Sequence, residues 1–144
     1  MTTKTPLPVF PGASPDMYQK TIDAIEAMIH VVDRDLKILL VNHGFFIWTK
    51  QLGFDFPDVK GRHLFDLFPF LTAKVREEYA SVFDSGEPLL SEETNEINGQ
   101  RIFTETKKIP IVENGFVAAV VTMVTDVTGE EDFITFPGIA ATEI

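Results

Sequence analysis

The sequence contains no cysteine, and that absence excludes several kinds of chemistry at once. Without a thiol the chain cannot form a disulfide, use a thiolate nucleophile, hold c-type haem through thioethers or form a covalent flavin adduct. Its three histidines, His30, His43 and His63, show no spacing typical of a metal site. No Ser-His-Asp arrangement, phosphate-binding loop or pair of catalytic carboxylates can be argued from spacing either. We therefore expect a chain that is not itself an enzyme and that holds no metal.

Positive charge is also scarce, because 12 Lys and Arg face 22 Asp and Glu, which gives a formal net charge of −10. Such a field repels phosphate, so direct binding of nucleic acid is not expected. No apolar run approaches the ~20 residues of a membrane-spanning helix. The N-terminus has no hydrophobic region of the kind found in signal peptides. We expect a cytoplasmic protein, or a cytoplasmic part of one, with no membrane insertion in this segment.

The most informative stretch that is present runs from Arg101 to Thr128 and predicts two strands joined at Asn114-Gly115. Asn-Gly tolerates the positive φ values of a tight hairpin turn. Residues 116–125 are apolar without alternation, which is typical of a strand covered on both faces and near the centre of a sheet. This strand ends at Asp126-Val127-Thr128, where a carboxylate and a hydroxyl can fix the segment that follows.

Upstream, residues 1–13 contain three prolines and predict an irregular N-terminal arm. Ser14-Pro15-Asp16 is typical of a helix start, with Ser as the N-cap and Pro in the first turn. The apolar residues that follow at helical spacing form one stripe, which consists of Tyr18, Ile22, Ile25 and Ile29. This stripe either docks only on the protein's own sheet or also forms a dimer interface with a partner chain.

The remaining pattern gives the order of elements. It predicts a first hairpin over residues 29–42, a helix over 43–52, a longer helix over 72–83 with Glu78 on its solvent side, and an acidic edge strand over 89–97. Strands at both ends of the chain and helices between them predict an α+β fold. We expect a five-stranded antiparallel sheet with helices packed on one face, an N-terminal flanking helix, and the last strand beside the first. The domain should cover residues 14–132, with 133–144 as a tail or the start of a linker.

Five short motifs in this order resemble those of the PAS domain, a sensory module of signal-transduction proteins such as sensor histidine kinases. They are V-V-D-R-D-L-K-I-L-L-V-N at 31–42, V-K-G-R-H-L-F-D-L-F-P at 59–69, V-F-D-S-G-E-P-L at 82–89, K-I-P-I-V-E-N-G at 108–115 and T-D-V-T at 125–128. The resemblance covers residues 16–131 and implies a five-stranded sheet with helices that enclose a cavity. In some PAS domains the cavity holds haem, flavin, a metabolite or a fatty acid, and in others it is packed solid. The resemblance also implies that Asp126 connects the sheet to a signalling segment.

Two features of this chain differ from PAS sensors. The Pro137-Gly138 pair cannot continue a long coiled coil after the domain. The chain is therefore either part of a larger sensor, for example of a two-component system, or a small protein that acts by binding a partner. Haem-binding PAS domains usually take the iron ligand from the longer helix. Residues 72–83 contain no histidine, so b-type haem is disfavoured and the cofactor stays unknown.

We expect the helices and the closing strands to converge over a candidate ligand pocket. Its predicted lining is mostly apolar, and its polar handles are the hydroxyls of Tyr79 and Thr122 together with His63. The predicted lining residues are Phe45, Trp48, Leu52, His63, Leu64, Phe68, Tyr79, Phe83, Phe103 and Thr122. Such a lining favours an apolar or aromatic ligand over a polyanion.

Two functions remain open at this point. In the first, the domain is a sensor that binds a small molecule, forms a homodimer and relays the signal through Asp126 and Thr128. In the second, the same side chains form an ordinary aromatic core, and the domain is a ligand-free dimerisation or docking module. A small enzyme on a cup-shaped α+β fold is a third and much weaker alternative.

Overall fold

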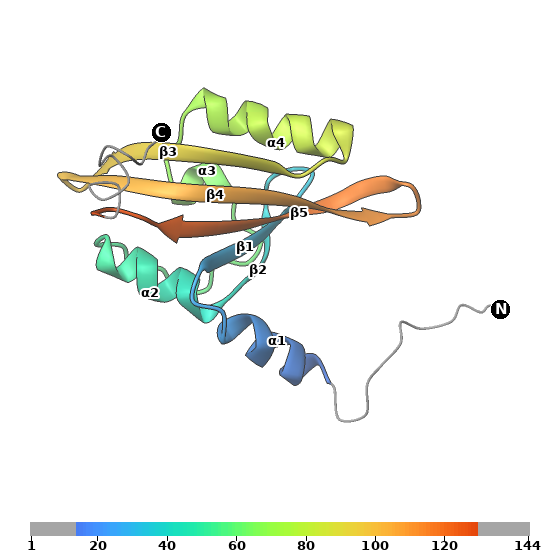
Figure 1. Cartoon of the computed structure of the whole chain (residues 1–144). Helices are drawn as coiled ribbons and strands as arrows, with labels where there is room; N and C mark the ends of the chain where they lie inside the picture. Colours follow the sequence, from blue (N-terminus) through green and yellow to red (C-terminus); the bar gives the residue numbers. More distant parts are fainter. Residues whose placement is uncertain (1–13, 130–144) are drawn as a thin grey trace, which may run out of the picture.

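The computed structural model describes residues 14–129 and shows a single sheet with helices (Figure 1). The predicted N-terminal arm and C-terminal tail, and the domain boundary at 132, lie outside the described residues. The helices are α1 (Pro15–Asp23), α2 (His43–Gln51), α3 (Leu64–Leu67) and α4 (Ala73–Ser85). The strands are β1 (Met28–Asp33), β2 (Ile38–Val41), β3 (Leu89–Ile97), β4 (Gln100–Glu113) and β5 (Phe116–Asp126).

The five strands form one antiparallel sheet in the order β2-β1-β5-β4-β3. This confirms the predicted α+β fold with the last strand beside the first. The turn between β4 and β5 has positive φ values at Asn114 and Gly115, as the Asn-Gly dipeptide predicts. Side chains of α2, α3 and α4 pack against β1 and β5 in the main core, whose centre is the fully buried Phe45.

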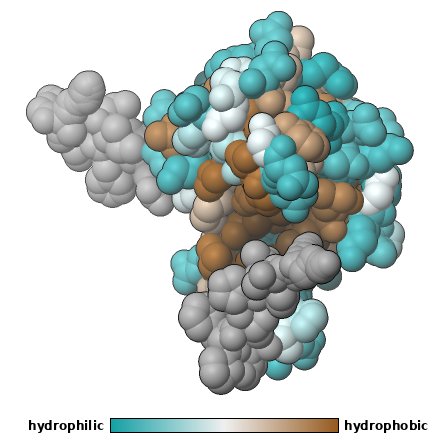
Figure 2. Space-filling model, turned by 90° about the vertical axis from the view of Figure 1, so that its right-hand side faces the viewer, coloured by the Kyte–Doolittle hydropathy of each residue, from teal (hydrophilic) through white to brown (hydrophobic). Residues whose placement is uncertain are grey.

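Within residues 14–129, helices pack on one face of β5 only, so the predicted cover on both faces is not found there. Val121 and Met123 point to the other face and are half-buried. Apolar surface also gathers on the side of the molecule where the β4–β5 hairpin lies (Figure 2). The hairpin contributes three exposed large apolar side chains to the described surface, Ile111, Val112 and Phe116. The sheet therefore leaves apolar surface uncovered on its open face and at its end.

The N-terminal helix begins as predicted but is shorter. The Ser14 side chain accepts a hydrogen bond from the Met17 amide, and the helix ends at Asp23. Tyr18 and Ile22 lie on α1 and Ile25 follows it, but Ile29 is buried in β1 opposite Met123, so its place in the helical stripe is wrong.

The cause of this early end is a side chain from much later in the sequence. The buried Asn42 amide donates to the carbonyls of Ile22, Ile25 and Ala27, which satisfies groups that end the helix and turn the chain into β1. The Asn42 side-chain oxygen accepts from the amides of Ile29 and Phe45, so it also caps α2. One side chain thus joins α1, β1 and α2.

Alternation along β3 and β4 decides which polar groups face the helices. Glu105 and Lys107 on β4 are exposed. Glu92 and Glu96 on β3 are exposed too, but Glu93 turns inward, which corrects the prediction of a uniformly solvated acidic edge. Glu78 of α4 is also buried rather than on the solvent side, because it lies against β3 and β4.

Candidate functional site

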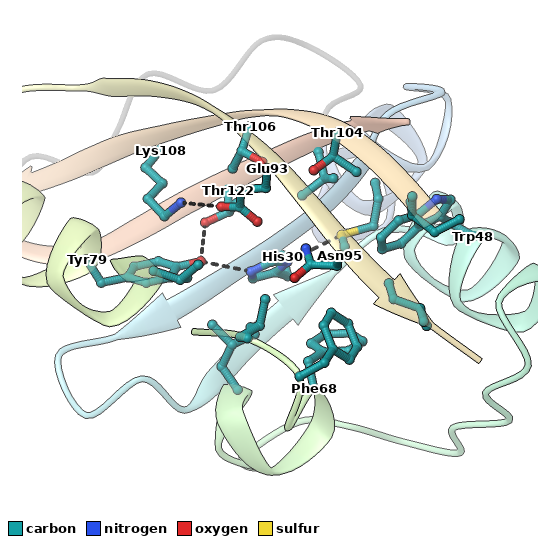
Figure 3. A pocket seen from close by; sticks show the side chains of 18 residues that line it. His30, Trp48, Phe68, Tyr79, Glu93, Asn95, Thr104, Thr106, Lys108 and Thr122 are labelled. Carbon is teal, nitrogen blue, oxygen red and sulfur yellow. Dashed lines mark hydrogen bonds and ion pairs between the residues drawn. The ribbon is translucent and has the colours of Figure 1, made fainter. Parts of the chain in front are cut away.

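A small cavity of about 50 Å³ lies between the sheet and the helices (Figure 3). One wall is apolar and comes from α3, the segment after it and the start of α4. The other wall is the inner face of the sheet. The lining includes five predicted residues, which are Trp48, Leu64, Phe68, Tyr79 and Thr122. These come from α2, α3 and its C-terminal cap, α4 and β5, so elements distant in sequence converge here.

The other five predicted pocket residues lie elsewhere. Phe45 is at the centre of the core, and Leu52 packs in a separate cluster with Ile97 and Ile102. His63 caps α3, where its Nδ1 accepts a hydrogen bond from the Phe65 amide. Phe83 is buried near the end of α4, and the Cζ atom of Arg34 lies 5.1 Å from the centre of its ring. Phe103 alternates with the cavity-lining Ile102 and Thr104, so it lies on the opposite face of β4.

The polar wall of the cavity was missed from the sequence. Its side chains come from three strands and are His30, Glu93, Asn95, Thr104, Thr106 and Lys108. Figure 3 shows Thr104, Thr106 and Lys108 following one another along β4. Side chains along β4 alternate between its two faces. Assigning the apolar Ile102 to the inner face, in place of Phe103, would have placed Thr104, Thr106 and Lys108 there as well.

His30, Tyr79 and Thr122 form a buried hydrogen-bonded chain across β1, α4 and β5. The Tyr79 hydroxyl lies 3.0 Å from His30 Nε2 and 2.6 Å from Thr122 Oγ1. Burial, and secondarily the charge of Lys108, lowers the pKa of His30 to about 3, so its ring is neutral at physiological pH. Burial raises the pKa of Tyr79 well above its ordinary value. These groups are therefore uncharged hydrogen-bonding partners, and they connect β1, α4 and β5 beside the cavity.

A buried ion cluster lies next to this chain. Lys108 Nζ is fully buried, 3.0 Å from Glu78 Oε1, 3.8 Å from Glu93 Oε2 and 4.9 Å from the centre of the Tyr79 ring. Glu78 also accepts from the Ser91 hydroxyl. Burial raises the pKa of Glu93, although the nearby Lys108 opposes the shift. One buried ammonium therefore faces two carboxylates at the edge of the cavity, and Nζ of the exposed Lys74 lies 3.7 Å from Glu78 Oε2.

The outer end of the cavity is connected to the end of the sheet. The Trp48 ring lines the cavity, and its Nε1–H donates to Asp126 Oδ2 at 2.8 Å. Asp126 Oδ1 accepts from the Thr128 amide at 2.9 Å, and the Thr128 hydroxyl accepts from the Phe103 amide at 3.0 Å. Burial alone would raise the pKa of Asp126, but the hydrogen bonds from Thr128 and Trp48 outweigh it and lower that pKa.

Within residues 14–129, no cluster of His, Asp and Glu has the composition and proximity of a metal site. In the same part of the chain, no helix combines the length and apolar character needed to cross a bilayer.

The chain is thus an α+β domain with a small cavity between its sheet and its helices. The model of the PAS fold family matches residues 22–132, so the chain belongs to the PAS family. PAS domains are sensory and signalling modules, and they are generally not catalytic. The sequence matches no curated protein at a significant level.

Solved structures show the same fold. The PAS domain of a protein from Colwellia psychrerythraea is 21% identical with a TM-score of 0.62, covering 78% of this chain and 96% of that one. A sensory box sensor histidine kinase from Vibrio cholerae is 20% identical with a TM-score of 0.56, covering 76% and 86%. An RNA-binding light-oxygen-voltage receptor is 20% identical with a TM-score of 0.64, but this chain spans only 38% of its length while 90% of this chain is covered.

Proposed function

We propose that this PAS domain senses a small, mostly apolar or aromatic ligand in the cavity and relays its presence through Trp48 and Asp126 to the C-terminal junction. The observation that carries the proposal is the double role of Trp48, whose ring lines the cavity while its indole N–H donates to Asp126. Asp126 in turn fixes the Thr128 amide beyond the last strand. A displacement of the ring therefore changes the contacts of the segment that leaves the domain.

The size of the cavity supports a mechanism in which the ligand displaces a wall. A cavity of about 50 Å³ has room for water but is small for an organic ligand. Typical sites for larger ligands span roughly 300–1,000 Å³. Tyr79 and Phe68 are almost fully buried, whereas Trp48 is partly exposed at the molecular surface. Trp48 can thus move at a lower cost than Tyr79 or Phe68, and in this mechanism ligand binding shifts the population toward its displaced position.

Removing the Asp126 carboxylate tests the relay. In a chimera with a histidine kinase output domain, Asp126→Ala should change ligand-dependent output, because the indole N–H and the Thr128 amide lose their shared acceptor. Asp126 is exposed, so the melting temperature should stay within a few degrees of the wild type. Asp84→Ala, at an exposed position near the end of α4, is the matched control. Unchanged output in the Asp126 variant would remove this residue from the signalling path.

The limited volume also favours the second function, a ligand-free docking or dimerisation module with a filled core. Exposed apolar residues at the β4–β5 hairpin are consistent with such a role. Native mass spectrometry of the protein as purified distinguishes the two functions. A retained small molecule supports the sensor, whereas an empty protein whose melting temperature no apolar or aromatic metabolite changes supports the docking module.

We further propose that the protein is a cytoplasmic homodimer in which α1 contributes to the interface. Met17 and Tyr18 on α1 and Ile25 after it are exposed at 46%, 52% and 38%, which leaves an apolar stripe without a partner in the described residues. Covering such side chains contributes up to about 1.5–3 kcal/mol each when burial is complete, and less when it is partial.

Substituting the stripe tests the interface by oligomeric state. Tyr18→Asp should shift sedimentation from dimer toward monomer, because a charge in an apolar interface is desolvated without a partner. Leu90→Asp, on the open face of the sheet, is the comparison, since Leu90 is 75% exposed and distant in sequence. If Leu90→Asp dissociates the dimer and Tyr18→Asp does not, the interface lies on the sheet and not on α1.

A further inference from the structure

We propose that Glu93, Thr106 and Lys108 form a subsite for an uncharged ligand head group that both donates and accepts hydrogen bonds, such as a primary amide. This inference rests on the proposed sensory function, because it specifies the chemistry of the ligand in the same cavity. The three side chains all line the cavity and come from the neighbouring strands β3 and β4 (Figure 3).

Thr106 is the first observation. Among the residues that the structure describes, its hydroxyl oxygen is the one buried side-chain nitrogen or oxygen without a hydrogen-bond partner. The residue is only 4% exposed, so bulk solvent does not supply the partner. Buried polar atoms are nearly always paired in folded proteins, and exceptions mark functional positions or bound molecules. A hydroxyl can donate or accept, so Thr106 suits a head group of either polarity.

The incomplete contact between Glu93 and Lys108 is the second observation. At 3.8 Å, Lys108 Nζ and Glu93 Oε2 are too far apart for a normal hydrogen bond, whereas the bond from Lys108 to Glu78 is 3.0 Å. An ammonium has three N–H donors, and a carboxylate accepts several hydrogen bonds. Glu93 therefore has acceptor capacity left for a ligand N–H, and Lys108 has donor capacity left for a ligand oxygen.

Charge selects an uncharged head. Lys74 and Lys108 balance the charges of Glu78 and Glu93, so the cluster has no net charge to attract an ion, and a carboxylate ligand would meet two carboxylates in a poorly solvated place. An ammonium ligand would meet Lys108, which is fully buried and cannot move into solvent. A buried charge without a dedicated partner is costly, but an amide satisfies an acceptor and a donor at once.

The opposite wall explains why only one end of the ligand is polar. Phe68, Phe70, Leu71 and Val75 carry no polar side-chain atoms and close the cavity from the helical side. A short apolar body can lie against them while the head group reaches the sheet. The site thus fits a small amphipathic molecule, which narrows the apolar or aromatic class proposed above.

Three small probes of similar size test the assignment: propionamide, propionate and n-butylamine. Each is titrated at millimolar concentration into the ¹⁵N-labelled protein, and the amide of Thr106 and the indole N–H of Trp48 are followed by NMR. Because Trp48 is the single tryptophan, its indole signal is unambiguous. Propionamide should shift both signals in a saturable way, with an affinity at least tenfold higher than that of either charged probe.

Two variants assign this preference to side chains. Thr106→Val keeps the β-branched shape but removes the hydroxyl, and it should weaken propionamide binding severalfold without loss of fold. Thr94→Val, at an exposed position on β3, is the matched control and should bind like the wild type. Glu93→Gln removes one carboxylate, so it should allow propionate to bind.

The outcomes separate this inference from the proposed function. If all three probes bind alike, or if propionamide binding survives Thr106→Val unchanged, the head-group assignment is wrong while the sensory role stands. If a purely apolar ligand binds and moves Trp48 but none of the three probes does, the assignment is wrong in the same way. If no small molecule of any class perturbs Trp48, the assignment and the ligand-sensing role both fall.

Discussion

Replacing Asn42 by alanine should lower the free energy of unfolding by about 3–5 kcal/mol, because an N-cap is worth about 1 kcal/mol and each buried group left unpaired costs about 1–3 kcal/mol. The Asn42 side chain is almost fully buried and bonds to two amides and three carbonyls from α1, β1 and α2. Its removal therefore leaves several backbone groups without partners at the junction of three elements. Denaturant unfolding followed by circular dichroism measures the loss.

Asn42→Ser is the matched variant. Serine is a good N-cap, so it should retain the cap of α2 but not the bonds to the carbonyls near the end of α1. We expect a stability between those of the wild type and the alanine variant. Equal stability of the wild type and Asn42→Ala would show that solvent replaces these bonds and that Asn42 does not hold the junction.

Replacing Lys108 by methionine should cost about 3–5 kcal/mol near neutral pH, the usual effect of removing one partner from a buried ion pair. Glu78 and Glu93 then remain in the protein without the ammonium that lies between them. The exposed neighbour Lys107 provides the control, because Lys107→Met should change stability by less than about 0.5 kcal/mol. Combining Lys108→Met with Glu78→Gln should recover part of the loss.

The pH dependence of the Lys108→Met variant gives a second measure. Burial already raises the pKa of Glu93 above its ordinary value of 4.5, and Lys108 opposes that shift. Without Lys108 the pKa of Glu93 in the folded state rises further. A raised folded-state pKa means that the stability is complete below about pH 4.5 and falls as the pH rises through the folded-state value. The difference between variant and wild type should therefore shrink on acidification, and a difference that stays constant between pH 4 and pH 7 would contradict the ion cluster.

The fold could be predicted from the sequence because its main signals are local. The Asn114-Gly115 turn depends on two residues that accept positive φ values, and both adopt them. The apolar run of β5 indicated a central strand, and β5 does lie between β1 and β4. Ser14 and Pro15 marked the start of α1 by chemistry that operates within one helical turn.

Errors arose where contacts between distant residues decide the structure. The end of α1 depends on hydrogen bonds from Asn42, and the apolar periodicity of residues 18–29 carries no information about that distant side chain. Likewise, Glu78 and Glu93 look like surface residues in their own segments, but the buried ammonium of Lys108 on β4 compensates for much of the cost of burying them. Charge alone is therefore a poor guide to burial when a partner comes from another element.

The candidate pocket was predicted in part for a related reason. Helical spacing correctly grouped Phe45 and Trp48 on the inner side of α2, but it says nothing about depth. Phe45 lies in the core and Trp48 at the cavity. On β4 the alternation was evident, yet its phase is ambiguous when apolar and polar residues mix, and a shift of one residue exchanges the two faces. Thr104, Thr106 and Lys108 were missed for this reason.

The most direct test of the central proposal perturbs the cavity from its helical wall and observes the junction itself. Val75 on α4 lines the cavity, and Val75→Phe should push the opposite wall at an overpacking cost of about 1–3 kcal/mol. We expect the Trp48 indole N–H and the Thr128 amide to shift together in the NMR spectrum, and we expect the Thr128 shift to disappear when Trp48→Phe is added. A Thr128 shift that persists without the indole, or a displaced Trp48 that leaves Thr128 unchanged, would contradict a relay through Trp48 and Asp126.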